Sequence, residues 1–248
     1  RAGEAYFSSD DSNIIFQAIP KGQKEYQIYR MNLEEGLPAM VSTGKGACTC
    51  AYFHPTKDKI IFASSHSDPI EVRKEDSYEG YKWHLTPYMN IYEANVDGTN
   101  LKALTEGEAY HAECTYSPDG KQIVYASNKC GSMNIYIMDE DGHNVKAITH
   151  TEGIYNGGPF FSPDGKKIIF RADRERPDYL QIYMIDLETL EEHLLTHNEA
   201  INWAPYWHPD GDKIAFTTSL HGHHRYEIYL LDLPTGRMQR ITDFPSFD

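Results

Sequence analysis

The sequence predicts an all-β protein, a β-propeller built from five copies of a four-stranded antiparallel module. Two observations predict it: a short turn motif that returns at a regular interval, and β-branched and aromatic segments between the turns. The turn prolines Pro118, Pro163 and Pro209 are 45 and 46 residues apart. A repeat of this length marks modules that stack, because no single module can bury its own apolar face.

The third module shows the order of its elements. Ser117-Pro118-Asp119-Gly120 is a hairpin turn, because Pro presets φ, Asp bonds turn amides and Gly accepts a positive φ. We expect the second strand at residues 122–126 and the third at 134–138, with an Asp-Gly turn before the fourth at 145–149. Each module is thus expected to form four short antiparallel strands.

The other copies repeat these segments. The third strands carry an Ile-Tyr pair, at Ile28-Tyr29, Ile91-Tyr92, Ile135-Tyr136, Ile182-Tyr183 and Ile228-Tyr229. The fourth strands end in an aliphatic residue and a hydroxyl residue, at Val41-Ser42, Leu104-Thr105, Ile148-Thr149, Leu195-Thr196 and Ile241-Thr242. We expect one domain over residues 1–248 with approximate modules 1–45, 46–108, 109–152, 153–199 and 200–248. The second module is longer, with an insert at about 65–88.

Two features depart from a regular repeat. The first hairpin has Ser9 and Asp11, and the second has Thr56 and Lys57, where later modules have Pro and Gly. We expect these two hairpins to be less regular. The sequence also ends at Asp248, before another turn motif is due. Two arrangements stay open: a closed five-bladed ring, or five blades of a six-bladed parent.

The repeat resembles a known family. The Ser-Pro-Asp-Gly turn, the Ile-Ile-Phe strand at residues 168–170, the Ile-Tyr strand, the Asp-Gly turn and the terminal Leu-Thr are similar to the TolB-type propeller repeat. The resemblance covers essentially the whole chain. That family includes a periplasmic protein and propeller domains attached to some peptidases, so the resemblance implies a periplasmic or extracellular propeller. It implies little about activity, because the matching residues build turns and strands.

Charge and hydropathy limit the classes of partner that the chain is expected to bind. The net charge of −14 argues against nucleic acid, which is bound through clusters of Lys and Arg. No run of about 18 apolar residues is present, so we expect no membrane span. No cationic and then apolar segment opens the sequence, so we expect no signal peptide in it. Four cysteines do not make a disulfide-rich framework, and we expect Cys48 and Cys50 to share one strand face.

We expect the binding residues at one end of the modules. In propellers, the loops entering the first strands share an end with the loops between second and third strands. Candidate residues for a protein, peptide or glycan partner are Tyr78, Tyr81, Trp83 and His84 of the insert, with His111, Asn156, Arg174 and Trp203. Long loops on a rigid scaffold commonly carry function, and aromatic rings can stack on sugars or anchor peptides.

A histidine cluster suggests a metal site as a further hypothesis. Imidazoles are common metal ligands, and a carboxylate from a neighbouring module can complete such a site. The candidate ligands are His111, Glu113, His223 and His224, which would hold a divalent cation. Short His-rich loops are more often solvated, so we otherwise expect no cofactor.

The sequence favours a binding protein over an enzyme. It contains no G-x-S-x-G nucleophile elbow and no G-x-x-x-x-G-K-[ST] phosphate loop. One alternative is a metal-assisted polysaccharide lyase or hydrolase, with His111, His223 and His224 as ligands and Arg174 or Arg176 as base. Another is an accessory propeller of a larger peptidase, which the fold alone does not decide.

Overall fold

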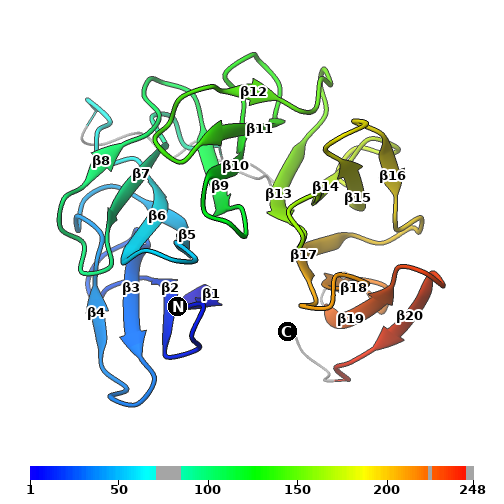
Figure 1. The fold of residues 1–248 in the computed structure, drawn as a ribbon, viewed down its shortest axis with the longest axis horizontal. Helices are drawn as coiled ribbons and strands as arrows, with labels where there is room; N and C mark the ends of the chain where they lie inside the picture. The colour runs from blue at the N-terminus through cyan, green and yellow to red at the C-terminus, as the bar shows by residue number, and fades with distance from the viewer. Residues whose placement is uncertain (71–84, 223–224, 244–248) are drawn as a thin grey trace. The chain divides into compact units, whose positions relative to one another are not determined.

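The computed structural model describes residues 1–70, 85–222 and 225–243. Within these residues the chain forms strands and no helix (Figure 1). The strands make five sheets of four, and each sheet follows the order of the chain. Neighbouring strands are antiparallel. This confirms the predicted all-β fold class with five four-stranded modules.

The strand bounds follow the predicted modules. The first sheet holds β1 (Ala2–Phe7), β2 (Asn13–Ala18), β3 (Gln27–Asn32) and β4 (Pro38–Met40), and the second holds β5 (Cys48–Phe53), β6 (Lys59–Ser64), β7 (Asn90–Asn95) and β8 (Lys102–Ala103). The third sheet holds β9 (His111–Tyr116), β10 (Gln122–Ser127), β11 (Asn134–Asp139) and β12 (Lys146–Ala147). The fourth sheet holds β13 (Asn156–Phe161), β14 (Lys167–Ala172), β15 (Gln181–Asp186) and β16 (Glu192–Leu194), and the fifth holds β17 (Asn202–Trp207), β18 (Lys213–Thr218), β19 (Glu227–Asp232) and β20 (Arg237–Arg240).

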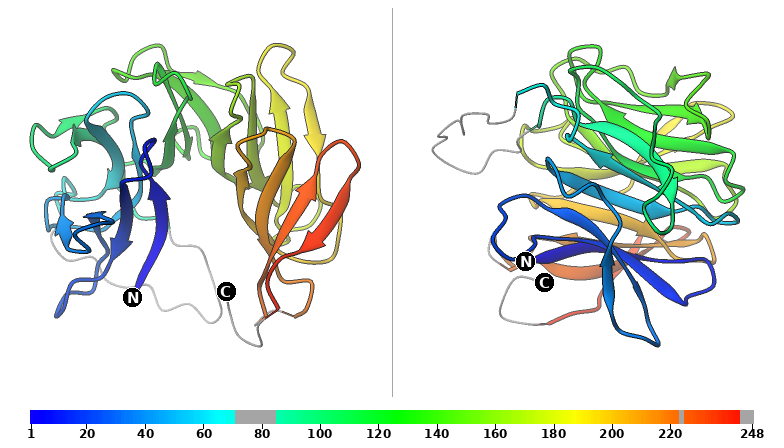
Figure 2. Two further views of the ribbon diagram at one scale, coloured as in Figure 1. Left: turned by 60° about the horizontal axis from the view of Figure 1, so that its bottom comes forward. Right: turned by 90° about the vertical axis from the view of Figure 1, so that its left-hand side faces the viewer.

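The chain divides into two compact units. The first comprises Arg1–Cys114 and Ser127–Lys129, and the second Thr115–Ala126 and Cys130–Asp248. Sheets one and two lie in the first unit, sheets four and five in the second, and the third sheet contributes to both. Figure 2 shows the successive antiparallel strands of the first sheet in blue and of the fifth in orange to red.

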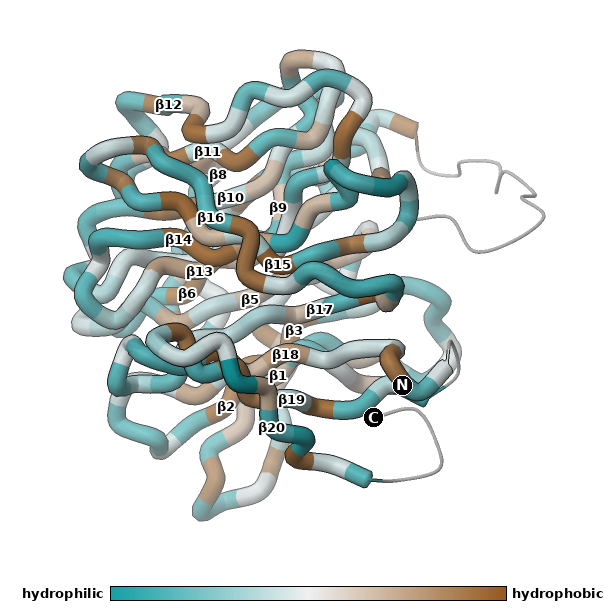
Figure 3. Tube along the Cα trace, turned by 90° about the vertical axis from the view of Figure 1, so that its right-hand side faces the viewer, coloured by the Kyte–Doolittle hydropathy of each residue, from teal (hydrophilic) through white to brown (hydrophobic). Residues whose placement is uncertain are grey.

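The core of each unit follows one packing rule. In the first unit, Ile15 and Ile28 of the first sheet pack with residues of the second, including Phe53 and Phe62. In the second unit, the fourth sheet presents Ile169 and Ile182, and the fifth presents Trp207, Ile214 and Phe216. An isoleucine face thus meets an aromatic face, which buries both. Figure 3 shows hydrophobic segments along strands such as β11 and β14, with hydrophilic residues in many of the turns.

The two most regular features of the repeat, the Ile-Tyr pair and the hydroxyl residue at the end of the fourth strand, are hydrogen-bonded to each other. The hydroxyl that ends each fourth strand accepts the N–H of the isoleucine in the Ile-Tyr pair. The five pairs are Ile28–Ser42 at 2.9 Å, Ile91–Thr105 at 2.8 Å, Ile135–Thr149 at 2.8 Å, Ile182–Thr196 at 2.8 Å and Ile228–Thr242 at 2.9 Å. Because buried backbone donors need an acceptor, the same hydroxyl recurs in every module.

A bulge interrupts the first strand of every sheet. The third residue of each such strand has positive φ: Glu4 at 49°, Cys50 at 54°, Glu113 at 57°, Gly158 at 59° and Ala204 at 50°. In the first, second, fourth and fifth sheets the pairing register shifts at that point. A bulge reorients the side chains that follow it. The expectation that Cys48 and Cys50 share one strand face rested on regular alternation, which the bulge at Cys50 interrupts. The Cys48 thiol contacts Ser64 Oγ at 3.2 Å, and the Cys50 thiol contacts Thr49 Oγ1 at 3.2 Å.

The two hairpins expected to be irregular behave differently. In the first, Ser8 Oγ donates to Asp10 Oδ1 at 2.6 Å, as Ser117 does to Asp119 at 2.7 Å, and Asp11 takes the positive φ of the later glycines at 57°. That hairpin is regular, because Asp tolerates the left-handed region. The second hairpin does differ: His54 Nδ1 accepts the Thr56 and Lys57 N–H groups at 3.1 and 3.0 Å.

The structure also bears on the expected lack of a membrane span. Across the ranges given above, it contains no helix of the length and apolar character that crossing a bilayer requires.

Candidate functional site

The loops entering the first strands meet the loops that follow the second strands. Backbone N–H groups of the former donate to the residue just after the second strand. The pairs are Ala47 to Ser65 Oγ at 3.0 Å, Tyr110 to Asn128 Oδ1 at 2.8 Å, Tyr155 to Asp173 Oδ1 at 2.9 Å and Ile201 to Ser219 Oγ at 2.9 Å. Within these four sheets, the two sets of loops share one end, as predicted. We call it the loop end of each sheet.

A buried arginine organises the loop end of the fourth and fifth sheets. Arg171 is 5% exposed, and its guanidinium lies 3.8 Å from the Trp203 ring centre and 5.6 Å from that of Tyr155. Its Nη2 donates to the Tyr155 hydroxyl at 2.8 Å. A Cβ on Gly158 would lie 1.9 Å from Nη1, so only glycine admits the guanidinium here. The sequence analysis included Trp203 and missed Arg171, whose signal is the Gly157-Gly158 pair on the opposing strand.

Two other predicted binding residues contact each other. Arg174 donates to Asn156 Oδ1 from Nη2 at 2.9 Å and from Nε at 3.2 Å, and it also pairs with Glu192. Its guanidinium lies 4.7 Å from the Tyr183 ring centre. Asn156 is fully buried, and its amide donates to Met133 O at 2.9 Å. These two residues hold the loop end together from inside.

His111 and Glu113 begin β9 in the first unit. Both side chains are buried, at 4% and 7% exposure. Burial first, and then the charge of Lys129, lower the pKa of His111 from 6.5 to about 4. Its imidazole is therefore neutral at neutral pH, the form that binds metals and not the form that donates a proton.

Thiols and carboxylates gather around the bulges of the first unit. Thr49 Oγ1 lies 3.3 Å from Glu4 Oε2, and Cys114 Sγ lies 3.6 Å from the carbonyl oxygen of Cys50. Burial raises the pKa of Cys114 to about 12, and the charges of Glu113 and Glu4 add to this. Burial, Glu4 and Glu113 likewise raise the pKa of Cys50 well above its usual value. Both thiols are protonated at neutral pH.

A group of one histidine and two aspartates lies at the hairpin between β17 and β18. Donor atoms of His208, Asp210 and Asp212 lie within 4.8 Å of one another, the one such group among the described residues. His208 Nδ1 accepts the Asp210 N–H at 3.3 Å, and Asp212 pairs with Lys213 at 3.0 Å. These contacts account for the cluster as a turn. The predicted metal ligands His223 and His224, and the insert residues Tyr78, Tyr81, Trp83 and His84, lie outside the described residues.

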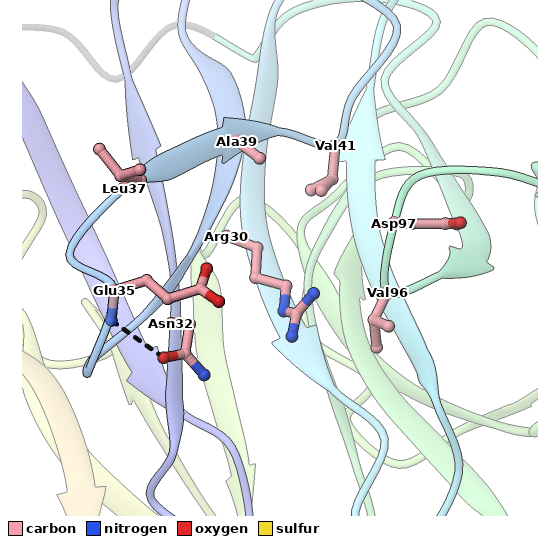
Figure 4. A pocket seen from close by; sticks show the side chains of 8 residues that line it. All are labelled: Arg30, Asn32, Glu35, Leu37, Ala39, Val41, Val96 and Asp97. Carbon is pink, nitrogen blue, oxygen red and sulfur yellow. Dashed lines mark hydrogen bonds between the residues drawn. The ribbon is translucent and has the colours of Figure 1, made fainter.

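Two pockets lie at the other end of the sheets, beside the hairpin turns. The larger, of about 310 Å³, lies in the first unit and combines Arg30 with Glu35, Asp97 and the apolar Val41 and Val96 (Figure 4). Asn32 Oδ1 accepts the Glu35 N–H at 3.2 Å there. The smaller, of about 150 Å³, is lined by Asp164, Lys167 and Trp207, among others, in the second unit. Neither pocket contains a predicted binding residue.

Comparison with known proteins supports the TolB-type resemblance. Residues 84–178 match the family model of the TolB beta propeller domain. The Tol-Pal system protein TolB of Francisella tularensis subsp. mediasiatica (strain FSC147) is 36% identical over 115 residues, which is 45% of this chain and 26% of that protein. The chain thus matches about a quarter of the length of this curated relative.

Solved structures agree over nearly the whole chain. The putative TolB from Agrobacterium tumefaciens superposes with a TM-score of 0.75 at 22% identity, covering 97% of this chain and 80% of that one. TolB from Acinetobacter baumannii gives a TM-score of 0.73 at 22% identity, covering 97% of this chain and 54% of that one. At this identity the similarity shows the fold. The chain therefore has the β-propeller fold of these structures, and residues 84–178 match the TolB-type propeller model.

Proposed function

We propose that the chain is a non-enzymatic TolB-like propeller that binds a protein, peptide or glycan through the loop ends of its sheets. The observation that carries the proposal is the stack of Trp203 on Arg171 in the second unit. Trp, Tyr and Arg are the residues that most often dominate binding energy at protein interfaces. Tyr155 completes this set beside the guanidinium.

The physical argument is preorganisation. The Trp203 ring is half-buried, and its partner Arg171 is held by the Tyr155 hydroxyl and by the close approach to Gly158. A partner that covers the remaining ring surface gains apolar burial without first ordering the side chain. Asn156 and Arg174 contribute by fixing the loops around this ring, since their polar groups bond each other.

The insert is a second candidate binding segment, which its sequence alone suggests. Tyr78, Tyr81, Trp83 and His84 supply further rings that can stack on a sugar or anchor a peptide. A periplasmic or extracellular location is proposed from the TolB-type resemblance. An enzymatic role for Arg174 has less support, because Asn156 and Glu192 occupy its guanidinium and Arg stays protonated.

A displayed-peptide library and a glycan array, applied to the full chain, test the proposal. We expect ligands whose affinity falls about 10-fold or more in Trp203→Ala, the loss typical of an interface anchor. Tyr206→Ala is the matched control, because Tyr206 is a 42% exposed aromatic on the same strand that packs edge-on against Phe160. Equal losses in both variants, or no enriched ligand, would refute the proposal. Product formation from uronic-acid polymers would point to the lyase instead.

A further inference from the structure

Two of the four cysteines approach each other in the first unit. Cys50 occupies the bulge of β5, and Cys114 follows the bulge residue Glu113 on β9. Cys114 Sγ lies 3.6 Å from the carbonyl oxygen of Cys50, so the thiol of one residue touches the main chain of the other. Disulfides join cysteines whose Cα atoms are about 4.4–6.8 Å apart, so the bond can form only if the two first strands reach that separation. Both cysteines are unbridged in the structure.

The other two cysteines have different surroundings. Cys48 is fully buried, and its thiol contacts Ser64 Oγ at 3.2 Å and Gln27 Oε1 at 3.6 Å. Ser64 lies on the neighbouring strand of the same sheet, and Gln27 lies on β3 of the first sheet. Cys130 is exposed. The approach of one thiol to the backbone of a second cysteine is therefore specific to Cys50 and Cys114.

We propose that Cys50 and Cys114 form a cross-link site that closes to an intramolecular disulfide in an oxidising compartment. The bulges support this assignment, because Cys50 and Glu113 take a positive φ that departs from regular strand geometry, and the Cys114 thiol contacts the Cys50 carbonyl beside them. A metal centre is the competing assignment for two thiols near Glu4 and Glu113. Among the described residues, no three of these thiols and carboxylates have donor atoms within 4.8 Å of one another, which argues against a metal centre.

The chemistry requires a disulfide oxidant, here glutathione disulfide or an oxidised dithiol oxidoreductase. One thiol loses its proton, and the thiolate attacks a sulfur of the oxidant and expels a thiolate that takes up a proton. The second cysteine then attacks the mixed disulfide, forming the Cys50–Cys114 bond and releasing the second reduced thiol. Two thiols are oxidised and one disulfide is reduced. Since Cys114 is buried and Cys50 is half-buried in the folded chain, the step proceeds during folding or local opening.

The consequence is a covalent link across a long stretch of chain. The closed loop runs from residue 50 to residue 114 and contains most of the second sheet, the insert and the start of β9. Closing a loop of this length restricts the unfolded chain, so the oxidised form should melt about 5–10 °C above the reduced form. The inference is independent of the proposed binding function, because it predicts a covalent state and not a partner.

The test counts thiols after refolding the full chain from urea in glutathione disulfide. The oxidised protein is denatured without reductant, alkylated with N-ethylmaleimide and weighed intact. We expect two labels on the wild type, on Cys48 and Cys130, and a digest peptide that joins Cys50 to Cys114. Cys50→Ser and Cys114→Ser should each take three labels. Cys48→Ser and Cys130→Ser are the matched controls, which should each take one label and keep the cross-linked peptide.

Two outcomes of the thiol count and the digest overturn the proposal. One is four labels on wild type that has refolded to its native circular dichroism in the oxidant. The other is a cross-link that involves Cys48 or Cys130 in place of the assigned pair. Loss of the melting difference between oxidised and reduced protein in both Cys50→Ser and Cys114→Ser supports the assignment, whereas its persistence in either variant contradicts it.

Discussion

Replacing Thr149 with Val tests the hydrogen bond that recurs at the end of every module. Thr149 is 2% exposed, accepts the Ile135 N–H at 2.8 Å and donates to Asn134 Oδ1 at 2.9 Å. Val has nearly the same shape but no hydroxyl. The variant therefore removes two hydrogen bonds and leaves the buried Ile135 N–H without its acceptor, while core volume is unchanged.

The magnitude follows from those contacts. A lost internal hydrogen bond costs about 1 kcal/mol, and an orphaned buried donor costs about 1–3 kcal/mol. We expect Thr149→Val to lower the free energy of unfolding by about 2–4 kcal/mol. For a chain of this size, each kcal/mol shifts Tm by about 2–4 °C.

Urea unfolding followed by circular dichroism measures the change. The matched control is Thr149→Ser, which keeps the hydroxyl and loses one methyl group, a change of about 1 kcal/mol. The reasoning predicts that the Val variant is clearly less stable than the Ser variant. Equal stability of the two, or a Val variant as stable as wild type, would refute it.

Three further predictions concern buried charges and the bulge. The pKa of His111 is about 4 in the folded chain against 6.5 unfolded, so its stability contribution is present above pH 6.5. This contribution of about 3 kcal/mol is lost as pH falls toward 4. The urea midpoints measured at pH 7 and at pH 4.5 should therefore differ less in His111→Gln than in the wild type. Arg240→Met removes the arginine that pairs with the fully buried Glu227 and should lower Tm. Glu227→Gln in the same chain should restore part of that loss in thermal melts. Gly158→Ala places Cβ against Arg171 at a φ of 59° and should lower Tm by several degrees, whereas an unchanged Tm would mean that the guanidinium is not held there.

Much of the fold could be predicted because it depends on local and repeated signals. The turn preferences at Ser117–Gly120 and the strand preferences of the Ile-Tyr segments act over a few residues. They can therefore be recognised without knowing which distant residues pack against them. The third-strand prediction for residues 134–138 agrees with β11 at Asn134–Asp139. The fourth strand is shorter than predicted, at Lys146–Ala147, because Thr149 turns its hydroxyl to Ile135 in place of continuing the ladder.

Less of the candidate site could be predicted, because it depends on residues far apart in the chain. The sequence predicts Trp203 and the loop end as parts of the site. The structure adds Arg171, which lies against Trp203 and fits there because the residue opposite it is Gly158. The sequence predicts Asn156 as a binding residue from its place near a loop. The structure places it in the interior, where its amide bonds the chain itself.

The sequence by itself determined the module: its four strands, its turns and the period at which they return. These properties follow from φ preferences and side-chain alternation within single segments, which need no distant partner. The tertiary structure alone decided which side chains meet. The bulge at Cys50 and Glu113 reverses the alternation, and the contact between Cys50 and Cys114 joins residues on separate sheets. Such contacts arise from packing between modules, where no periodic pattern records which residues will be neighbours.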